Sequence, residues 1–342
     1  MIETQIRRNS PTLGEAEAAA AANAVLANWA GRGPETAFFE NEFCELHGLS
    51  EGHAVAVSSG SAALYLALSA FGAGGKRVAV PAYACQPLSH AVRAVRAEPV
   101  IIDSRSVHDP NADVDVLGAS GAQIAIVSHS FGIPQIIGAQ PALIIEDCAQ
   151  SLGAFAGGAR VGLQGAVAVF SFGPTKMITA AGAGGMLLSK DDRCIEYVRD
   201  FLAYYDRSDD RLRFNFEITD VQSAVGRVQL RRLPEFVARR EELFSCYRRS
   251  GAVLLTASDP RVFPVRFGAV VLSDNLPELQ RALTASGIPV CRPLEPRHLL
   301  GSPGGNPNAH GFASRALSLP LYPSLSDADA TFVTAALASA AA

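Results

Sequence analysis

The sequence predicts an α/β protein built around a mostly parallel central sheet, and three observations support this fold class. Short apolar runs recur from residue 54 onward. Each run is separated from the next by a candidate helix or loop, as in repeated strand–helix units. The runs are apolar throughout instead of alternating with polar residues, which is typical of strands buried on both faces. In chain order they are "AVAV", "RVAVPAY", "EPVIID", "QIAIVSH", "ALIIED", "VAVFSF" and "GGMLLS".

Two helices are expected before the first strand. The segment "PTLGEAEAAAAANAVLANWAGRG" opens with a proline and a turn and then becomes rich in alanine, the strongest helix former. We expect this helix to end near Gly31, because glycine commonly follows a helix. The charged and aromatic segment "ETAFFENEFCELHGL" predicts the second helix.

The pattern changes after residue 190, where the chain becomes more helical and more charged. The segment "ITDVQSAVGRVQLRRLPEFVARREELFSCYRRS" predicts two helices divided at Pro234. Strand-like runs follow between Val262 and Leu272, then a helix around 276–286, a loop "GSPGGNPNAHG", and a last helix capped near Ser326 or Asp327. We therefore expect a large domain over residues 1–225 and a smaller C-terminal α+β domain over residues 226–342.

Composition limits the classes of function. The chain has 342 residues, of which 49% are hydrophobic and 18% charged, as in globular proteins. A net charge of −4 without a basic cluster predicts no nucleic-acid partner. The chain has no apolar run long enough for a bilayer and no signal-peptide pattern at its start, so we expect no membrane association. Its six cysteines lack C-x-x-C or zinc spacing, which predicts no metal site and reduced thiols in the cytoplasm.

A serine-rich turn lies at the first strand end. In "VSSGSAALYLAL" the residues Ser58 to Ser61 join a strand to a strong helix pattern. Free amides at a helix N-terminus, serine hydroxyls and a glycine that permits close approach suit a phosphate. Taken alone, this motif is more simply explained as an ordinary helix N-cap.

Two other strand ends carry polar residues, and ligands bind at this edge in open α/β sheets. Asp147 follows "ALIIE", with Gln150 three residues later. A buried carboxylate needs a partner, although an Asp here can also simply cap a turn. Lys176 follows "VAVFSF" and precedes a glycine-rich run. A lysine in an apolar pocket has a lowered pKa and can attack an aldehyde, whereas the alternative is a side chain that extends to solvent.

Together, these three strand ends match the needs of pyridoxal 5'-phosphate. Its phosphate needs an anchor, its pyridine nitrogen needs an acidic partner, and its aldehyde needs a lysine. The acidic partner keeps the ring protonated, so that the ring can accept the electrons released when the substrate Cα–H bond breaks.

The ordered set of segments resembles the DegT/StrS family of pyridoxal-phosphate sugar aminotransferases, which have the fold type I aminotransferase architecture. The resemblance runs from about residue 10 to about residue 335. Besides the opening helices, the segments that carry it are "VSSGSAALYLAL", "RVAVPAYACQPLSHAVRAVRAEPVIID", "IIEDCAQSLGA", "FSFGPTKMITAAGAGG" and "FNFEITDVQSAVGRVQLRRL".

The resemblance implies roles for individual residues. Lys176 would bind the cofactor aldehyde and then move the proton between the substrate and the cofactor. Asp147 would pair with the pyridine nitrogen, and Gln150 would contact the 3-hydroxyl side or the ring face. Asn215 would reach the cofactor of a neighbouring subunit, which implies a homodimer with shared active sites. The residues that would hold the phosphate are Gly60, Ser61 and Ser171.

The chain departs from the family pattern at several positions. Cys85 stands where the family usually has an aromatic residue that stacks on the cofactor ring. A thiol offers less contact area, and Tyr83 is an alternative stacking residue. Ala183 replaces a frequent glutamate and Glu217 a frequent arginine.

The resemblance implies transfer of an amino group from L-glutamate or L-glutamine to a keto sugar, most often a nucleotide-linked one, in aminosugar biosynthesis. A keto cyclitol is an alternative acceptor, and Arg292 and His298 either face such substrates or lie on the surface. Sugar dehydratases of the family carry histidine at the lysine position, so Lys176 argues against that reaction. A desulfurase would need a mobile cysteine, for which Cys291 is the candidate in unlike surroundings. A non-catalytic regulatory or scaffold homologue is the remaining alternative.

Overall fold

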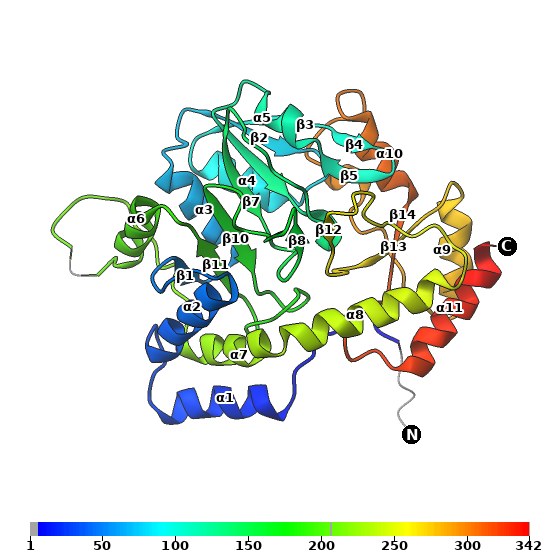
Figure 1. The fold of residues 1–342 in the computed structure, drawn as a ribbon, viewed down its shortest axis with the longest axis horizontal. Helices are drawn as coiled ribbons and strands as arrows, with labels where there is room; N and C mark the ends of the chain where they lie inside the picture. Colours follow the sequence, from blue (N-terminus) through cyan, green and yellow to red (C-terminus); the bar gives the residue numbers. More distant parts are fainter. Residues whose placement is uncertain (1–5, 206, 342) are drawn as a thin grey trace.

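A seven-stranded sheet forms the centre of the molecule (Figure 1). The computed structural model describes residues 6–205 and 207–341. β11 runs antiparallel to both of its neighbours, whereas the other pairings in the sheet are parallel. All seven predicted strands are present, so the predicted α/β class is confirmed. In spatial order they are β1 (Ala54–Val57), β11 (Gly185–Leu188), β10 (Val167–Ser171), β7 (Leu143–Asp147), β6 (Ile124–Ser128), β2 (Arg77–Pro81) and β3 (Glu98–Ile102).

The strands are apolar throughout because both faces of the sheet are covered. Successive side chains of a strand point to opposite faces. In β1, Val55 and Val57 pack into a core that includes α3 (Gly60–Ala70), α4 (Gln86–Ala94) and α6 (Asp192–Leu202). Ala54 and Ala56 pack on the other side, against phenylalanines of α2 (Pro34–Leu46).

The first helix, α1 (Glu15–Leu26), is shorter than predicted. The sequence predicted an end near Gly31, but the chain leaves the helix after Ala27, and Asn28 has a φ of 61°. Asparagine tolerates this left-handed conformation, which commonly ends helices. The second helix, α2, is present as predicted. Buried Asp220 of α7 (Asp220–Arg231) accepts hydrogen bonds from the amides of residues 33, 35 and 36, and so caps α2 from a distant segment.

The helix α8 (Leu233–Arg248) leads from the large sheet to the C-terminal part of the chain (Figure 1). α7 ends at Arg231, so the predicted division near Pro234 is confirmed. The C-terminal part has its own core, formed by α8, α9 (Leu276–Ala285), α11 (Asp327–Ala341) and the antiparallel pair β13 (Ala269–Leu272) and β14 (Ala316–Leu319). The domain division at residue 225 falls within α7 and stays a prediction.

Several short elements were not predicted. The run from Val262 to Leu272 forms two strands in different sheets, because β12 (Val262–Phe263) pairs with β8 (Phe155–Ala156), which in turn pairs with β9 (Ala159–Arg160). α10 (Pro307–Arg315) begins inside the segment predicted as a loop, and the carboxylate of Asp103 accepts hydrogen bonds from its first amides. The others are β4 (Ser104–Ser106), β5 (Asp109–Ala112), α5 (Val114–Gly118) and the 3-10 turns η1 (Ser130–Gly132) and η2 (Pro296–His298). Within the described residues, every helix is too short or too polar to cross a membrane.

Candidate active site

A cavity of about 310 Å³ lies where β6, β7 and β10 end. Parallel strands bring their carboxyl ends to one edge of a sheet, so residues far apart in sequence meet there. The predicted site residues Gly60, Ser61, Cys85, Asp147, Gln150, Ser171 and Lys176 all line this cavity, together with Tyr83, Ser128, His129 and apolar side chains such as Leu64, Leu88 and Leu294. The structure therefore brings together every predicted site residue except Asn215.

One end of the cavity is formed by the N-terminus of α3. Ser59 caps this helix, since its Oγ accepts a hydrogen bond from the Ala62 amide at 3.1 Å. The amides of Gly60 and Ser61 open the helix and have no intrahelical acceptor. A Cβ on Gly60 would lie 2.8 Å from Cβ of Ser171, so only glycine permits this approach of α3 to β10. The amides of Gly60 and Ser61 and the hydroxyls of Ser61 and Ser171 therefore form a site suited to an anion.

Asp147 ends β7 and presents a carboxylate that is only partly satisfied. Ser128 Oγ donates to Oδ2 at 3.1 Å, and the Ala149 amide donates to Oδ1 at 3.1 Å. A carboxylate offers about four lone-pair positions, so the group can accept further donors. Ser128 was not predicted from the sequence. The signal that reveals it is the parallel register, which pairs Ser128 with Asp147.

Gln150 is oriented by the turn beside it. Its Oε1 accepts a hydrogen bond from the Phe131 amide at 2.6 Å, and Phe131 has a φ of 57°. The amide oxygen of Gln150 therefore supports this strained turn. Its NH₂ group remains as the donor that can face a ligand in the cavity.

Lys176 follows β10 and is half-buried. Its Nζ lies 5.5 Å from the centre of the Phe267 ring. No hydrogen bond or ion pair joins Lys176 Nζ to another residue that the structure describes. The amine is therefore available to a ligand.

Cys85 stands at the N-terminus of α4, in the same cavity as Lys176. Burial raises the pKa of the Cys85 thiol, Lys176 opposes this change and Asp147 adds to it, with a net rise. The thiol is therefore neutral at physiological pH. Tyr83 is buried, and its ring packs edge-on against Phe312 with 4.9 Å between centroids.

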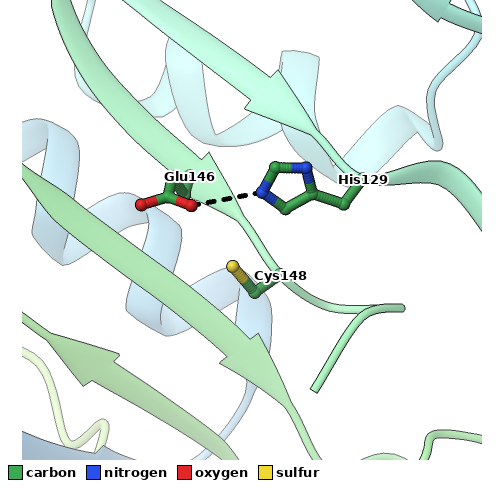
Figure 2. A group of neighbouring side chains, drawn as sticks. All are labelled: His129, Glu146 and Cys148. Atoms are coloured by element: carbon green, nitrogen blue, oxygen red, sulfur yellow. Dashed lines mark hydrogen bonds and ion pairs between the residues drawn. The ribbon is translucent and has the colours of Figure 1, made fainter. Parts of the chain in front are cut away.

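A second polar cluster lies on the opposite face of β7, and Figure 2 shows its members, His129, Glu146 and Cys148. Glu146 is fully buried. His129 Nε2 donates to its carboxylate at 3.2 Å, since Nδ1 of the same ring accepts from the Gln135 amide. The amides of residues 162, 164 and 165 donate to the two carboxylate oxygens at 2.9, 2.7 and 2.6 Å.

These contacts explain how a charge is tolerated in the core. Burial acts to raise the pKa of Glu146, but the hydrogen bonds from His129 and from the backbone amides outweigh burial and leave the pKa below its usual range. Four N–H donors occupy the two oxygens, so the carboxylate has no open position for a metal ion. Burial also raises the pKa of the Cys148 thiol well above its usual range.

Other residues singled out in the sequence lie outside the cavity. Asn215 is exposed on the segment between α6 and α7, where its Oδ1 accepts a hydrogen bond from the Glu217 amide. Arg292 donates to the Ala313 carbonyl, and the ring of His298 lies beside Arg297. Cys291 accepts a hydrogen bond from Arg8, in the C-terminal part of the molecule.

The fold is that of the type I aminotransferases that use pyridoxal phosphate. The model of the DegT/DnrJ/EryC1/StrS aminotransferase family matches residues 11–338, and the chain belongs to this family. The resemblance predicted from the sequence is therefore confirmed, as are the reaction class and the cofactor.

Similar proteins span nearly the whole chain. The dTDP-3-amino-3,4,6-trideoxy-alpha-D-glucose transaminase of Streptomyces venezuelae is 33% identical, with 86% of this chain and 83% of that protein covered. The erythromycin biosynthesis sensory transduction protein EryC1 of Saccharopolyspora erythraea is 34% identical, with 90% and 91% covered. The crystal structure of the aminotransferase TlmJ from Streptoalloteichus hindustanus is 28% identical and superposes with a TM-score of 0.89 over 98% of both chains.

Proposed function

We propose that this protein transfers an amino group from L-glutamate or L-glutamine to a keto sugar linked to a nucleotide, in aminosugar biosynthesis. The observation that carries the proposal is the cavity itself, which joins an anion cradle, a partly satisfied carboxylate and an unpaired lysine. Similarity to transaminases named for nucleotide-linked amino sugars supports the choice of acceptor.

The residues of the cavity fit the proposed cofactor. The amides of Gly60 and Ser61, with the hydroxyls of Ser61 and Ser171, would hold the phosphate. The space beside Gly60 supports this assignment, because a side chain there would collide with Ser171. When bound, the cofactor supplies an aldehyde that captures amines and a ring that accepts electrons.

The remaining side chains would act on the ring and the substrate. Asp147 would accept a hydrogen bond from the ring nitrogen of the cofactor. The NH₂ of Gln150 would donate a hydrogen bond toward the 3-hydroxyl side of the same ring. Cys85 would pack against the ring, in place of an aromatic residue. Lys176 Nζ would hold the cofactor at rest, and during transfer it would take the proton from the substrate Cα.

We propose that the protein works as a homodimer in the cytoplasm. Asn215 is exposed, and apolar side chains on the same segment are also exposed, with 77% of Tyr205, 70% of Leu212 and 41% of Phe214 accessible. A second subunit that covers this segment would bring Asn215 to a neighbouring cofactor phosphate. All six cysteines are free, which supports a reducing compartment.

The function is tested by incubating the purified protein with pyridoxal phosphate, L-glutamate and dTDP-linked 3-keto and 4-keto 6-deoxyhexoses. Mass spectrometry should detect an aminated sugar nucleotide, with 2-oxoglutarate released in equal amount. L-glutamine and a keto cyclitol are tested in parallel, to identify the donor and the acceptor class. If every keto substrate is unchanged while glutamate is still converted to 2-oxoglutarate in a single half-reaction, the proposed acceptor class is wrong.

A regulatory role is the second candidate, because one relative is named a sensory transduction protein. The complete set of cavity residues favours catalysis instead.

Light scattering tests the oligomeric state independently. The proposal predicts a dimer, and a monomer that is fully active would contradict the shared active site.

A further inference from the structure

Ser128 lies beside Asp147 because of the register of the sheet. β6 and β7 are parallel, and Ser128 is paired directly with Asp147. Paired residues on adjacent strands have side chains on the same face. On the other side of β7 the paired residue is Val169, whose side chain cannot donate a hydrogen bond. Among the described residues, Ser128 is therefore the side chain that donates to Asp147.

We propose that Ser128 is a positioning residue that orients the Asp147 carboxylate toward the ring nitrogen of the cofactor. This inference rests on the proposed role of Asp147. The Ser128 hydroxyl donates to Oδ2 at 3.1 Å, and the Ala149 amide donates to Oδ1 at 3.1 Å. With one hydrogen-bond donor on each oxygen, the plane of the Asp147 carboxylate is fixed.

The Ser128 backbone is itself held in place. Its carbonyl accepts a hydrogen bond from Gln135 Nε2 at 3.1 Å, and the residue is 9% exposed. The next residue, His129, turns to the opposite face and pairs with Glu146. The carbonyl contact and the following His129–Glu146 pair therefore restrain the chain on both sides of the hydroxyl, which favours one orientation toward Asp147.

Other titratable groups around Asp147 do not take over this role. Burial raises the pKa of the thiols of Cys85 and Cys148, so both stay neutral in the range where a carboxyl titrates. The groups that face or adjoin Asp147 are Lys176 in the cavity, Cys85 from α4, Cys148 next in the chain, and the His129–Glu146 pair on the other face of β7. All of them are unchanged when Ser128 is substituted.

The experiment measures binding of pyridoxal phosphate to the apoprotein by absorbance at pH 7, for five proteins. These are the wild type, Ser128→Ala, Ser128→Thr, Asp147→Asn and Ser189→Ala. Ser189 is the matched control, since it is a buried serine whose Oγ donates to the Ala166 carbonyl at 2.7 Å, away from the cavity.

We expect Ser128→Ala to bind the cofactor about tenfold more weakly at pH 7, as for loss of one hydrogen bond to a charged group. Threonine keeps the hydroxyl and should restore the affinity. Ser189→Ala should match the wild type.

The variants test the proposed roles of Ser128 and Asp147 separately. If Asp147→Asn weakens binding and Ser128→Ala matches Ser189→Ala in affinity, the role of Ser128 is wrong while that of Asp147 stands. If Asp147→Asn binds the cofactor like the wild type, the proposed role of Asp147 is wrong and the inference falls with it.

Discussion

Glu146 and Asp147 are neighbours on β7, yet their surroundings differ completely. Glu146 points into the core and accepts four N–H donors, as Figure 2 shows for His129. Asp147 points into the cavity and accepts two donors. A carboxylate whose oxygens all accept hydrogen bonds from the protein stabilises the fold. A carboxylate that keeps free lone pairs at a strand end can bind a ligand. The alternation of a strand assigns these two tasks to adjacent residues.

This comparison predicts that changes on the cavity face reduce activity and leave stability intact, while changes on the core face do the reverse. The largest effect is expected at Lys176. Lys176→Ala should lower the rate of amino transfer by about 10³-fold or more, because among the residues that the structure describes no other lysine lines the cavity to move the proton. Its melting temperature should stay close to that of the wild type.

The matched control for that variant is Lys190→Ala, which removes an exposed lysine near the end of β11. It should retain full activity in the same assay. Equal activity of the two variants would contradict the catalytic role of Lys176 and favour the regulatory alternative.

A core change should give the opposite result. Glu146→Gln places an NH₂ group among N–H donors, so it should lower the free energy of unfolding by about 3 kcal/mol, as expected when a buried ionic network is broken. Denaturation in urea measures this change. Asp147→Asn should cost less than about 1 kcal/mol in the same measurement, and a reversed order would refute the comparison.

The buried carboxyl of Glu146 also predicts that the stability of the fold depends on pH. The pKa of Glu146 is lowered in the folded protein, so its ionised form stabilises the fold above the ordinary carboxyl range near pH 4.3, and this contribution is lost as the pH falls through the folded pKa. The difference in unfolding free energy between the wild type and Glu146→Gln should therefore narrow below about pH 4. A constant difference down to pH 3 would show that ionisation of Glu146 does not contribute.

The smallest predicted effect concerns the thiol in the cavity. The Cys85 side chain is exposed to solvent, although its surroundings raise the pKa of the thiol, so iodoacetamide should label it in the apoprotein at alkaline pH, where the thiolate forms. Saturating pyridoxal phosphate should slow this labelling about tenfold, since the thiol would pack against the ring. Partly exposed Cys291 lies outside the cavity and is the internal control, whose labelling rate should not change. Peptide mass spectrometry measures both rates, and equal rates at Cys85 with and without cofactor would exclude ring contact.

Much of the fold could be predicted because local sequence determines it. The seven apolar runs are strands of one sheet, and the polar residues Asp147, Ser171 and Lys176 meet at the edge where ligands bind in such sheets. Short elements such as β4 and β5 were missed because their few residues are polar and carry no period. α10 was missed because its first turn depends on Asp103, a residue about 200 positions earlier.

The polar network could not be predicted in the same way. Ser128 reaches Asp147 only through the register of β6 and β7, which no local pattern specifies. Apart from His129, the partners of Glu146 are backbone amides of the loop before β10, and amides have no sequence signature. The proposed role of Asn215 also requires a second subunit, because Asn215 lies outside the cavity formed by this chain.

The central claim is that the cavity at the end of β7 and β10 holds pyridoxal phosphate on Lys176. The chain has three lysines, Lys76, Lys176 and Lys190, so the claim can be tested by trapping the cofactor with borohydride and mapping the modified peptide by mass spectrometry. The account predicts that the cofactor mass is found on the peptide that contains Lys176 and on neither of the others. Attachment to Lys76 or Lys190, or no attachment with cofactor in excess, would contradict it.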